Sequence, residues 1–279
     1  MRYNDDDESP RRRDEDDDRP RRRRDEDDDR EPPARRPAKR GMSTGLIIGI
    51  VVGVLLICVA APILLLLPAR EKVRMAAARS RDQSNLKQIS IGASNKESAT
   101  GYLATGPYAT DPTAGAPNSG LSFRVDLLPY IEQAYLDKQF RKDEAWDSAN
   151  NRPLSNTSVS TLASPLDPPG TATTRYRAFV GPGSVFEPGK KVRLTDILDG
   201  SSNTIFVVSA DEGVIWSKPE ELNYTETGPL PKIGQKSFAG GTNVVLCDGS
   251  VRFLTNSTSD TVLRALITRN GGEVLPLDY

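Results

Sequence analysis

The sequence predicts an α+β protein in which a long amino-terminal helix precedes a carboxy-terminal antiparallel sheet. An apolar run at 45–67 leads into a segment, 68–97, that is rich in helix-forming residues. Short β-branched or aromatic runs, bounded by Gly, Asp or Pro, fill the last hundred residues. Because helices come first and strands second, the pattern is typical of an α+β domain rather than of alternating βαβ units.

Residues 1–44 form a highly charged tail for which we expect disorder. Residues 1–41 contain 15 acidic and 14 basic side chains, and RRRDEDDDR occurs at 11–19 and again at 22–30. With almost no apolar side chains, this segment has nothing to bury. The rest of the chain carries 38 − 15 = 23 acidic and 37 − 14 = 23 basic side chains. Neither part has the basic excess of a nucleic-acid-binding protein, so no nucleic-acid partner is expected.

The run from Gly45 to Leu67 predicts a single transmembrane helix. It holds 23 residues without a charge, an amide or a hydroxyl. A helix of this length spans about 34 Å, enough for a hydrocarbon core of roughly 30 Å. No small-residue cleavage site follows, so we expect an uncleaved signal anchor with the lipid bilayer as partner. Five basic residues precede the run and six follow it within 20 residues, so charge alone does not orient it.

The helix is expected to continue beyond the membrane over 68–97 and to pack on the domain that follows. Pro68, near the interface, is expected to kink it. A weak apolar stripe with helical spacing supports the packing. Its members are Val73, Ala76, Ala77, Leu86, Ile89 and Ala93.

Residues 98–279 are expected to form one α+β head domain. A loop is expected at 98–120, followed by an amphipathic helix over Phe123–Phe140 with Pro129 near its start. The face of this helix is predicted to hold Val125, Leu128, Ile131 and Tyr135. Strands are expected later in the domain, at 175–181, 203–210, 214–216, 242–247 and 250–254.

Two local signals refine the carboxy-terminal part. Asp248-Gly249 lies between the last two predicted strands, which favours a hairpin with a type I′ turn and positive φ at both residues. A short helix over Asp260–Thr268 is expected to end at a cap formed by 270–272, Asn-Gly-Gly.

The composition excludes several kinds of catalytic site. The chain has no histidine, which removes Ser-His and Cys-His nucleophiles and His-ligated metals. Cys58 lies in the apolar run and Cys247 far beyond it, so no disulfide is expected and Cys247 is interpreted as a small buried residue.

The remaining candidate residues also have structural interpretations. Asp199 and Asp248 are weak candidates for a cation site, but turn chemistry explains both Asp-Gly pairs, so no metal or cofactor is expected. Trp146 and Trp216 could stack on sugars, or could serve as core or interface anchors that need no ligand.

The order of motifs resembles that of a pilin-like bacterial family, domain of unknown function 1559. The resemblance covers roughly 63–279 and includes LLLPAREKVRMAAARSRDQSNLKQI, LLPYIEQAYL, FVGPGSVF, GGTNVVLCDGSVRFL and LRALITRNGGEV. It implies a pilin-like fold and an extracytoplasmic head, with the amino terminus in the cytoplasm and a single pass through the cytoplasmic membrane. Its carboxy-terminal motif positions correspond here to Gly240, Gly241, Asn243, Asp248 and Gly249.

The chain also departs from the family pattern. The histidine of the family motif, which nine residues separate from its Asp-Gly, falls at Phe238. Two family cysteines correspond to Asp82 and Ser164, which implies that the disulfide is not used. The prepilin signature after Gly41 is missing, so prepilin processing and pilus-type assembly are not expected.

These observations favour a non-enzymatic, membrane-anchored envelope protein with a structural or partner-interaction role. Partners would be other envelope proteins, or a second copy of the chain through an exposed apolar stripe along 46–93. The alternative is an extracytoplasmic solute- or glycan-binding module, which predicts a concave pocket lined by aromatics such as Trp146, Tyr130 or Trp216. A hydrolase that uses loop carboxylates as acid and base, with Asp211, Glu212, Glu220 and Glu221 as the candidates, is the least favoured class.

Overall fold

The computed structural model describes residues 41–103 and 120–275, without the side chains of 60–69. Most of the predicted tail, the side chain of Pro68 and most of the loop predicted at 98–120 lie outside the described residues. The helices are α1 (Thr44–Thr100), α2 (Phe123–Leu127), the 3-10 helix η2 (Leu128–Tyr130), α3 (Ala134–Asp137), α4 (Arg152–Ser155), the 3-10 helix η3 (Leu194–Asp196) and α5 (Asp260–Ile267). The strands are β1 (Thr173–Arg177), β2 (Phe179–Val180), β3 (Ile205–Ile215), β4 (Leu222–Asn223), β5 (Gly241–Leu246) and β6 (Val251–Thr255).

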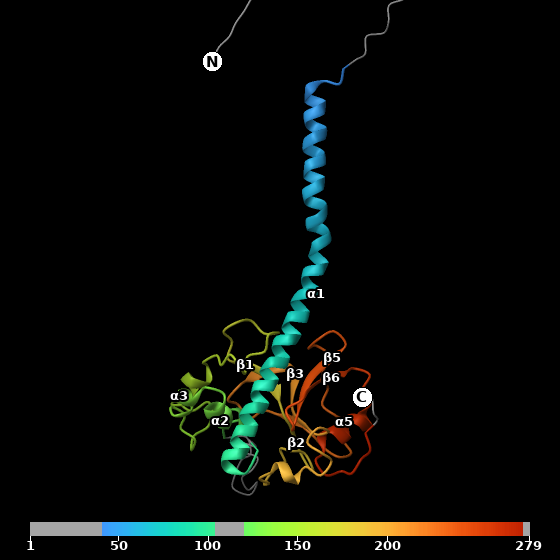
Figure 1. Ribbon diagram of the computed structural model, residues 1–279. Helices are drawn as coiled ribbons and strands as arrows, with labels where there is room; N and C mark the ends of the chain where they lie inside the picture. The colour runs from blue at the N-terminus through green and yellow to red at the C-terminus, as the bar shows by residue number, and fades with distance from the viewer. Residues whose placement is uncertain (1–40, 104–119, 276–279) are drawn as a thin grey trace, which may run out of the picture. The chain divides into compact units, whose positions relative to one another are not determined.

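The centre of the head is a four-stranded sheet in the order β1-β3-β5-β6, with every neighbouring pair antiparallel. The short strands β2 and β4 pair in parallel beside it. In Figure 1 the carboxy-terminal half of α1 crosses this sheet, with α2 and α3 on one side and α5 on the other. Helices together with an antiparallel sheet confirm the predicted α+β class.

Side chains from the two central strands pack into two separate hydrophobic clusters. Val207 of β3 and Val245 of β5 belong to a cluster that contains Leu86, Ile89 and Ala93 of α1. Their strand neighbours Val208, Val244 and Leu246 belong to a second cluster, together with Leu263, Leu266 and Ile267 of α5. Since successive side chains of a strand point to opposite faces, both faces of the sheet are buried. All six residues of β5 are buried accordingly.

Burial along α1 begins at Asp82. Leu86, Ile89 and Ala93 are buried as expected, whereas Val73, Ala76 and Ala77 are exposed, so the first half of the predicted stripe is wrong. The described residues fall into two units that divide after Cys58. In the described part of the first unit, large apolar side chains from Leu46 to Ile57 are 45% to 67% exposed.

The predicted membrane span at 45–67 falls partly on side chains outside the described set. Within the part of the chain that the structure describes, no helix combines the length and the hydropathy that a membrane crossing requires.

The single helix predicted over Phe123–Phe140 is wrong, because the segment is divided into α2, η2 and α3. Pro129 has no N–H to donate and lies in the first turn of η2, where that loss costs nothing. Glu132 then takes a left-handed φ of 63°, which interrupts any helix. Ile131 is buried, but Tyr135, predicted on the same face, is 82% exposed.

Strands occur at the predicted places, but their bounds differ. The run 175–181, predicted as one strand, is divided between β1 and β2, which belong to different sheets. The run 214–216 is not a separate strand, because β3 continues from Ile205 to Ile215. The hairpin between β5 and β6 is at the predicted place, but its turn is not type I′: Gly249 has a φ of 82° and Asp248 does not have a positive φ. Leu246 accepts a hydrogen bond from the N–H of Gly249 and donates one to Ser250. This three-residue loop resembles a type I turn closed by a left-handed glycine.

The glycine cap predicted for the last helix is also wrong. The helix ends at Ile267 because Thr268 is extended, with φ −78° and ψ 147°. Thr268 instead forms an antiparallel bridge with Ser184, which ties the end of α5 to the loop after β2.

Gly241 provides a test of the sheet packing. A Cβ on Gly241 would lie 2.0 Å from the backbone oxygen of Leu254 in β6, whereas a Cβ on Gly240 would meet nothing within 4 Å. Gly241→Ala is expected to lower the free energy of unfolding by about 2–3 kcal/mol. Gly240→Asn, at a φ of 88° that Asn tolerates, is expected to cost less than about 1 kcal/mol. Denaturant titration of both variants measures the difference; equal losses would contradict it.

Candidate functional site

The first cluster of buried polar side chains lies between α1 and the sheet. Asp82 of α1 is fully buried and accepts a hydrogen bond from Asn243 Nδ2 of β5 at 2.8 Å. Its other oxygen accepts from Ser209 Oγ of β3 at 3.0 Å. One turn further along, Asn85 donates to the Tyr176 hydroxyl of β1 at 3.1 Å and to the backbone oxygen of Ala163 at 3.0 Å. One side of α1 therefore contacts three strands through polar groups.

Burial controls the electrostatics of this cluster. It raises the pKa of Asp82 above its usual 3.8, although the hydrogen bonds from Asn243, Tyr176 and Ser209 oppose the shift. Burial, and secondarily the charge of Asp82, raise the pKa of Tyr176 well above its usual 10.0. Neither group has the exposure that proton exchange with a ligand requires.

A second line of contacts joins α1 to the β5–β6 hairpin. Lys87 Nζ donates to the backbone oxygen of Gly249 at 2.8 Å, and the guanidinium of Arg79 lies 3.6 Å from the centroid of the Phe253 ring. A Cβ on Gly249 would lie 2.8 Å from Ser90 Oγ. Glycine at this position therefore provides the turn conformation and also permits the close approach of α1.

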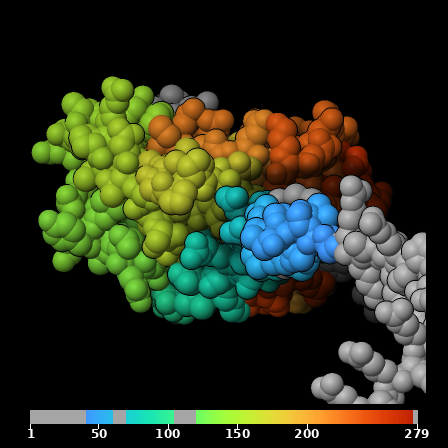
Figure 2. Space-filling view, turned by 90° about the horizontal axis from the view of Figure 1, so that it is seen from above, coloured from blue at the N-terminus to red at the C-terminus, as the bar shows by residue number. Residues whose placement is uncertain are grey.

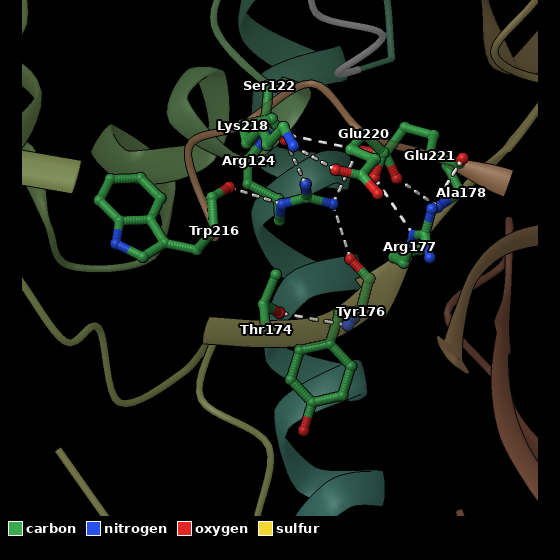
Figure 3. Close-up of polar contacts among 10 residues, drawn as sticks. All are labelled: Ser122, Arg124, Thr174, Tyr176, Arg177, Ala178, Trp216, Lys218, Glu220 and Glu221. Carbon is green, nitrogen blue, oxygen red and sulfur yellow. Dashed lines mark hydrogen bonds and ion pairs between the residues drawn. The ribbon is translucent and has the colours of Figure 1, made fainter. Parts of the chain in front are cut away.

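The second cluster surrounds Arg124 of α2 (Figure 3). Its side chain is fully buried and forms an ion pair with Glu221, at 2.8 Å from Nη1 to Oε1. The guanidinium also donates to three backbone oxygens, of Trp216 at 2.7 Å, Tyr176 at 2.8 Å and Lys218 at 2.9 Å. Glu221 Oε2 accepts from the Ala178 N–H at 2.8 Å.

This arrangement holds the charges of Arg124 and Glu221 in the interior of the head and does not expose them to a ligand. Burial raises the pKa of Glu221, and the charge of Arg124 is the largest opposing influence. Both oxygens of Glu221 are occupied by donors from the chain, and so are both oxygens of Asp82. The geometry is suited to holding α1, α2 and the sheet together rather than to acid–base chemistry on a substrate.

The two predicted cation candidates both accept hydrogen bonds from the chain, Asp199 from a distant segment and Asp248 within its own turn. Asp199 accepts from the N–H groups of Gly271 at 2.7 Å and Gly272 at 2.9 Å. Asp248 accepts from the N–H and hydroxyl of Ser250 at 2.8 and 2.7 Å. Within 41–103 and 120–275, no group of three or more Cys, Asp or Glu side chains has a spacing suited to a metal ion.

The two tryptophans and Phe238 differ in burial and in the groups that they contact. Trp216 is 1% exposed, donates from Nε1 to Thr157 and packs edge-on against Phe140, with ring centroids 5.5 Å apart. Trp146 is half-buried with the Lys218 ammonium 5.7 Å from its ring. Phe238, at the position of the family histidine, is buried and bridges to Gly241.

The two cysteines differ in exposure. Cys58 is exposed, whereas Cys247 is half-buried against the core. Burial raises the pKa of the Cys247 thiol, and the charge of Asp248 adds to that shift. The thiol form of Cys247 therefore dominates at neutral pH.

Four cavities in the described part of the head bear on the predicted aromatic pocket. Their volumes are about 360, 20, 310 and 420 Å³. None of these four is lined by Trp146, Tyr130 or Trp216. The aromatic side chains predicted to line a solute pocket therefore do not form the wall of any of these four cavities.

A family profile described as a protein of unknown function (DUF1559) matches residues 71–183. Over this segment the chain is similar to the DUF1559 family. The match confirms the resemblance inferred from the motifs. It includes Asp82 and Arg124 and ends before their partners Asn243 and Glu221. No curated protein and no solved structure matches the chain.

Sequence reasoning missed Arg124, Ser209 and Tyr176. It treated Glu221 as a solvated loop carboxylate, whereas Glu221 is buried and paired with Arg124. One signal was available for Arg124, a charged residue between the apolar Phe123 and Val125. Such a residue is buried only when it is paired, which predicts a distant carboxylate but not its identity.

The buried ion pair yields a stability prediction. Arg124→Met leaves Glu221 and three backbone oxygens without their donor, and is expected to lower the free energy of unfolding by about 3–5 kcal/mol. The matched control is Lys236→Met, because Lys236 pairs with Glu212 at 3.2 Å where both side chains are about 70% exposed. That control is expected to lose at most about 1 kcal/mol. Similar losses in urea titrations would contradict the assignment.

Asp82 yields a pH prediction. Because its pKa in the folded chain lies above 3.8, the folded chain binds more protons than the unfolded chain between these two values. The contribution of Asp82 to the free energy of unfolding is therefore largest below pH 3.8 and falls as pH rises through the folded pKa. Asp82→Asn lacks this titration. The free energy of unfolding of the wild type minus that of the variant should therefore fall between pH 3.8 and the folded pKa of Asp82, and level off above it. A difference that grows with pH would contradict the raised pKa.

Proposed function

We propose that this protein is a non-enzymatic envelope protein, anchored in the cytoplasmic membrane by one helix, with a pseudopilin-like extracytoplasmic head that has a structural or partner-interaction role. The single observation that carries the proposal is the character of α1. Its first part exposes large apolar side chains, and its last part is joined to the sheet by buried polar and apolar contacts.

The membrane anchor is supported by the apolar side chains of α1. Leu55, Leu56 and Ile57 are 62%, 63% and 67% exposed, and they belong to the uncharged run 45–67. A helix that is apolar all round needs an apolar environment. Lipid supplies that environment without any further protein partner.

The structural role is supported by the use of the buried ionisable groups. Asp82, Arg124 and Glu221 each bind backbone or side-chain groups from other elements of the head. They connect α1, α2 and the sheet, which gives a stiff unit suited to presenting a surface. The missing prepilin signature favours an anchor that is retained rather than processed.

The proposed topology is tested with single cysteines in intact spheroplasts. In a background of Cys58→Ser and Cys247→Ser, a membrane-impermeant maleimide is expected to label Tyr135→Cys, an 82% exposed head position. It is expected not to label Asn4→Cys in the tail unless the membrane is permeabilised. Labelling of the tail but not the head would reverse the topology, and labelling of both without permeabilisation would contradict the anchor.

The proposed interaction role is tested by crosslinking from α1. Met75→Cys places a thiol on a 37% exposed position beyond the apolar run. A short bismaleimide applied to cells is expected to yield a discrete adduct, either a dimer of this chain or a complex with one envelope protein. Tyr135→Cys, outside α1, is the control and is expected to yield none. Absence of adducts from Met75→Cys, or equal adducts from both positions, would contradict an interaction through α1.

A further inference from the structure

We propose that the cavity between α1 and the loop 158–170 binds an acidic saccharide, a short chain of pyranose rings that carries carboxylates. This site is independent of the membrane anchor and of the aromatic residues predicted from the sequence. Its volume is about 420 Å³, within the range of small-molecule sites. In Figure 2 the yellow-green atoms of this part of the chain border the teal atoms of α1.

The polar wall of the cavity has hydrogen-bonding groups that the described chain leaves unused. Asn85 is 93% buried and donates from its amide nitrogen twice, but its Oδ1 accepts no hydrogen bond from the described residues. Gln88 uses its oxygen to accept from Thr161, which leaves its Nε2 hydrogens available. The hydroxyls of Ser158 and Ser160 also have no partner among the described residues. Together they offer donors and an acceptor to a ligand rich in hydroxyls.

The cavity also has apolar lining residues. Pro165, Pro168 and Pro169 line it together with Ala163. A pyranose ring has hydroxyls around its edge and C–H groups on its faces. Such a ligand can place its C–H face against the prolines and its edge against the amides and hydroxyls.

The charge of the cavity selects an acidic ligand. Asp167 lines it, but Arg175 neutralises that carboxylate, with contacts of 2.8 Å from Nε and 2.7 Å from Nη2. Arg81 of α1 also lines the cavity, is exposed, and has no anionic partner among the described residues. The guanidinium of Arg81 is therefore available to a ligand, and its planar set of N–H groups can donate two parallel hydrogen bonds to a carboxylate. A single cation among neutral groups suits the one charge of a uronate.

The test uses calorimetric titration of the full-length chain with tri-galacturonic acid, and with maltotriose as the neutral probe. The acidic probe is expected to bind and maltotriose to bind at least tenfold more weakly. Arg81→Gln is expected to weaken binding of the acidic probe about tenfold or more. Arg74→Gln is the matched control, since Arg74 is an exposed arginine on the same helix that does not line the cavity. It is expected to leave binding unchanged.

A second variant keeps the test independent of charge. Ser160→Tyr introduces a ring at an exposed position of the cavity wall and is expected to abolish binding without changing the melting temperature. The proposal is overturned if the wild-type chain binds neither probe at 10 mM, or binds both equally. It is also overturned if Arg81→Gln and Arg74→Gln weaken binding alike, or if Ser160→Tyr binds normally.

Discussion

The structure of the head depends on one buried contact, that of Asp82 in α1 with Asn243 in β5. A polar pair at this place fixes the rotation and the register of the helix, because a shift by one residue would leave both groups buried without a partner. Leu86 and Ile89 supply apolar burial, on the order of 1.5–3 kcal/mol for each side chain, but such contacts tolerate sliding. The burial of Asp82 raises its pKa, which indicates that this specificity carries a desolvation cost.

Tyr176 of β1 connects that contact to the rest of the head. Its hydroxyl accepts from Asn85 on α1, while its backbone oxygen accepts from Arg124 on α2. Arg124 in turn reaches the segment after β3 through Trp216, Lys218 and Glu221. Helix, sheet and the short helices after 120 are therefore linked by one continuous set of polar contacts.

The sequence predicted the order of elements and the position of the final hairpin, because these follow from local periodicity and from the Asp-Gly pair. It predicted the wrong turn type, because Asp248 uses its carboxylate to accept from Ser250 and leaves the positive φ to Gly249 alone. The helix expected over 123–140 failed because Glu132 adopts a left-handed conformation that periodicity does not reveal. The partners of Asp82 and Arg124 lie far along the chain, and no local pattern specifies such pairings. The saccharide cavity combines α1 with a loop about 80 residues later, so only the fold brings its residues together.

Amide hydrogen exchange along α1 of the full-length chain tests the central claim most directly. If the contact of Asp82 with Asn243 fixes α1 on the sheet, amides of 82–97 should exchange as slowly as those of β5, while the exposed residues 70–77 exchange faster. Asn243→Ala should accelerate exchange over 82–97 and leave α5 protected. Exchange over 82–97 that matches 70–77 in the wild-type chain, or that is unchanged in Asn243→Ala, would contradict the account.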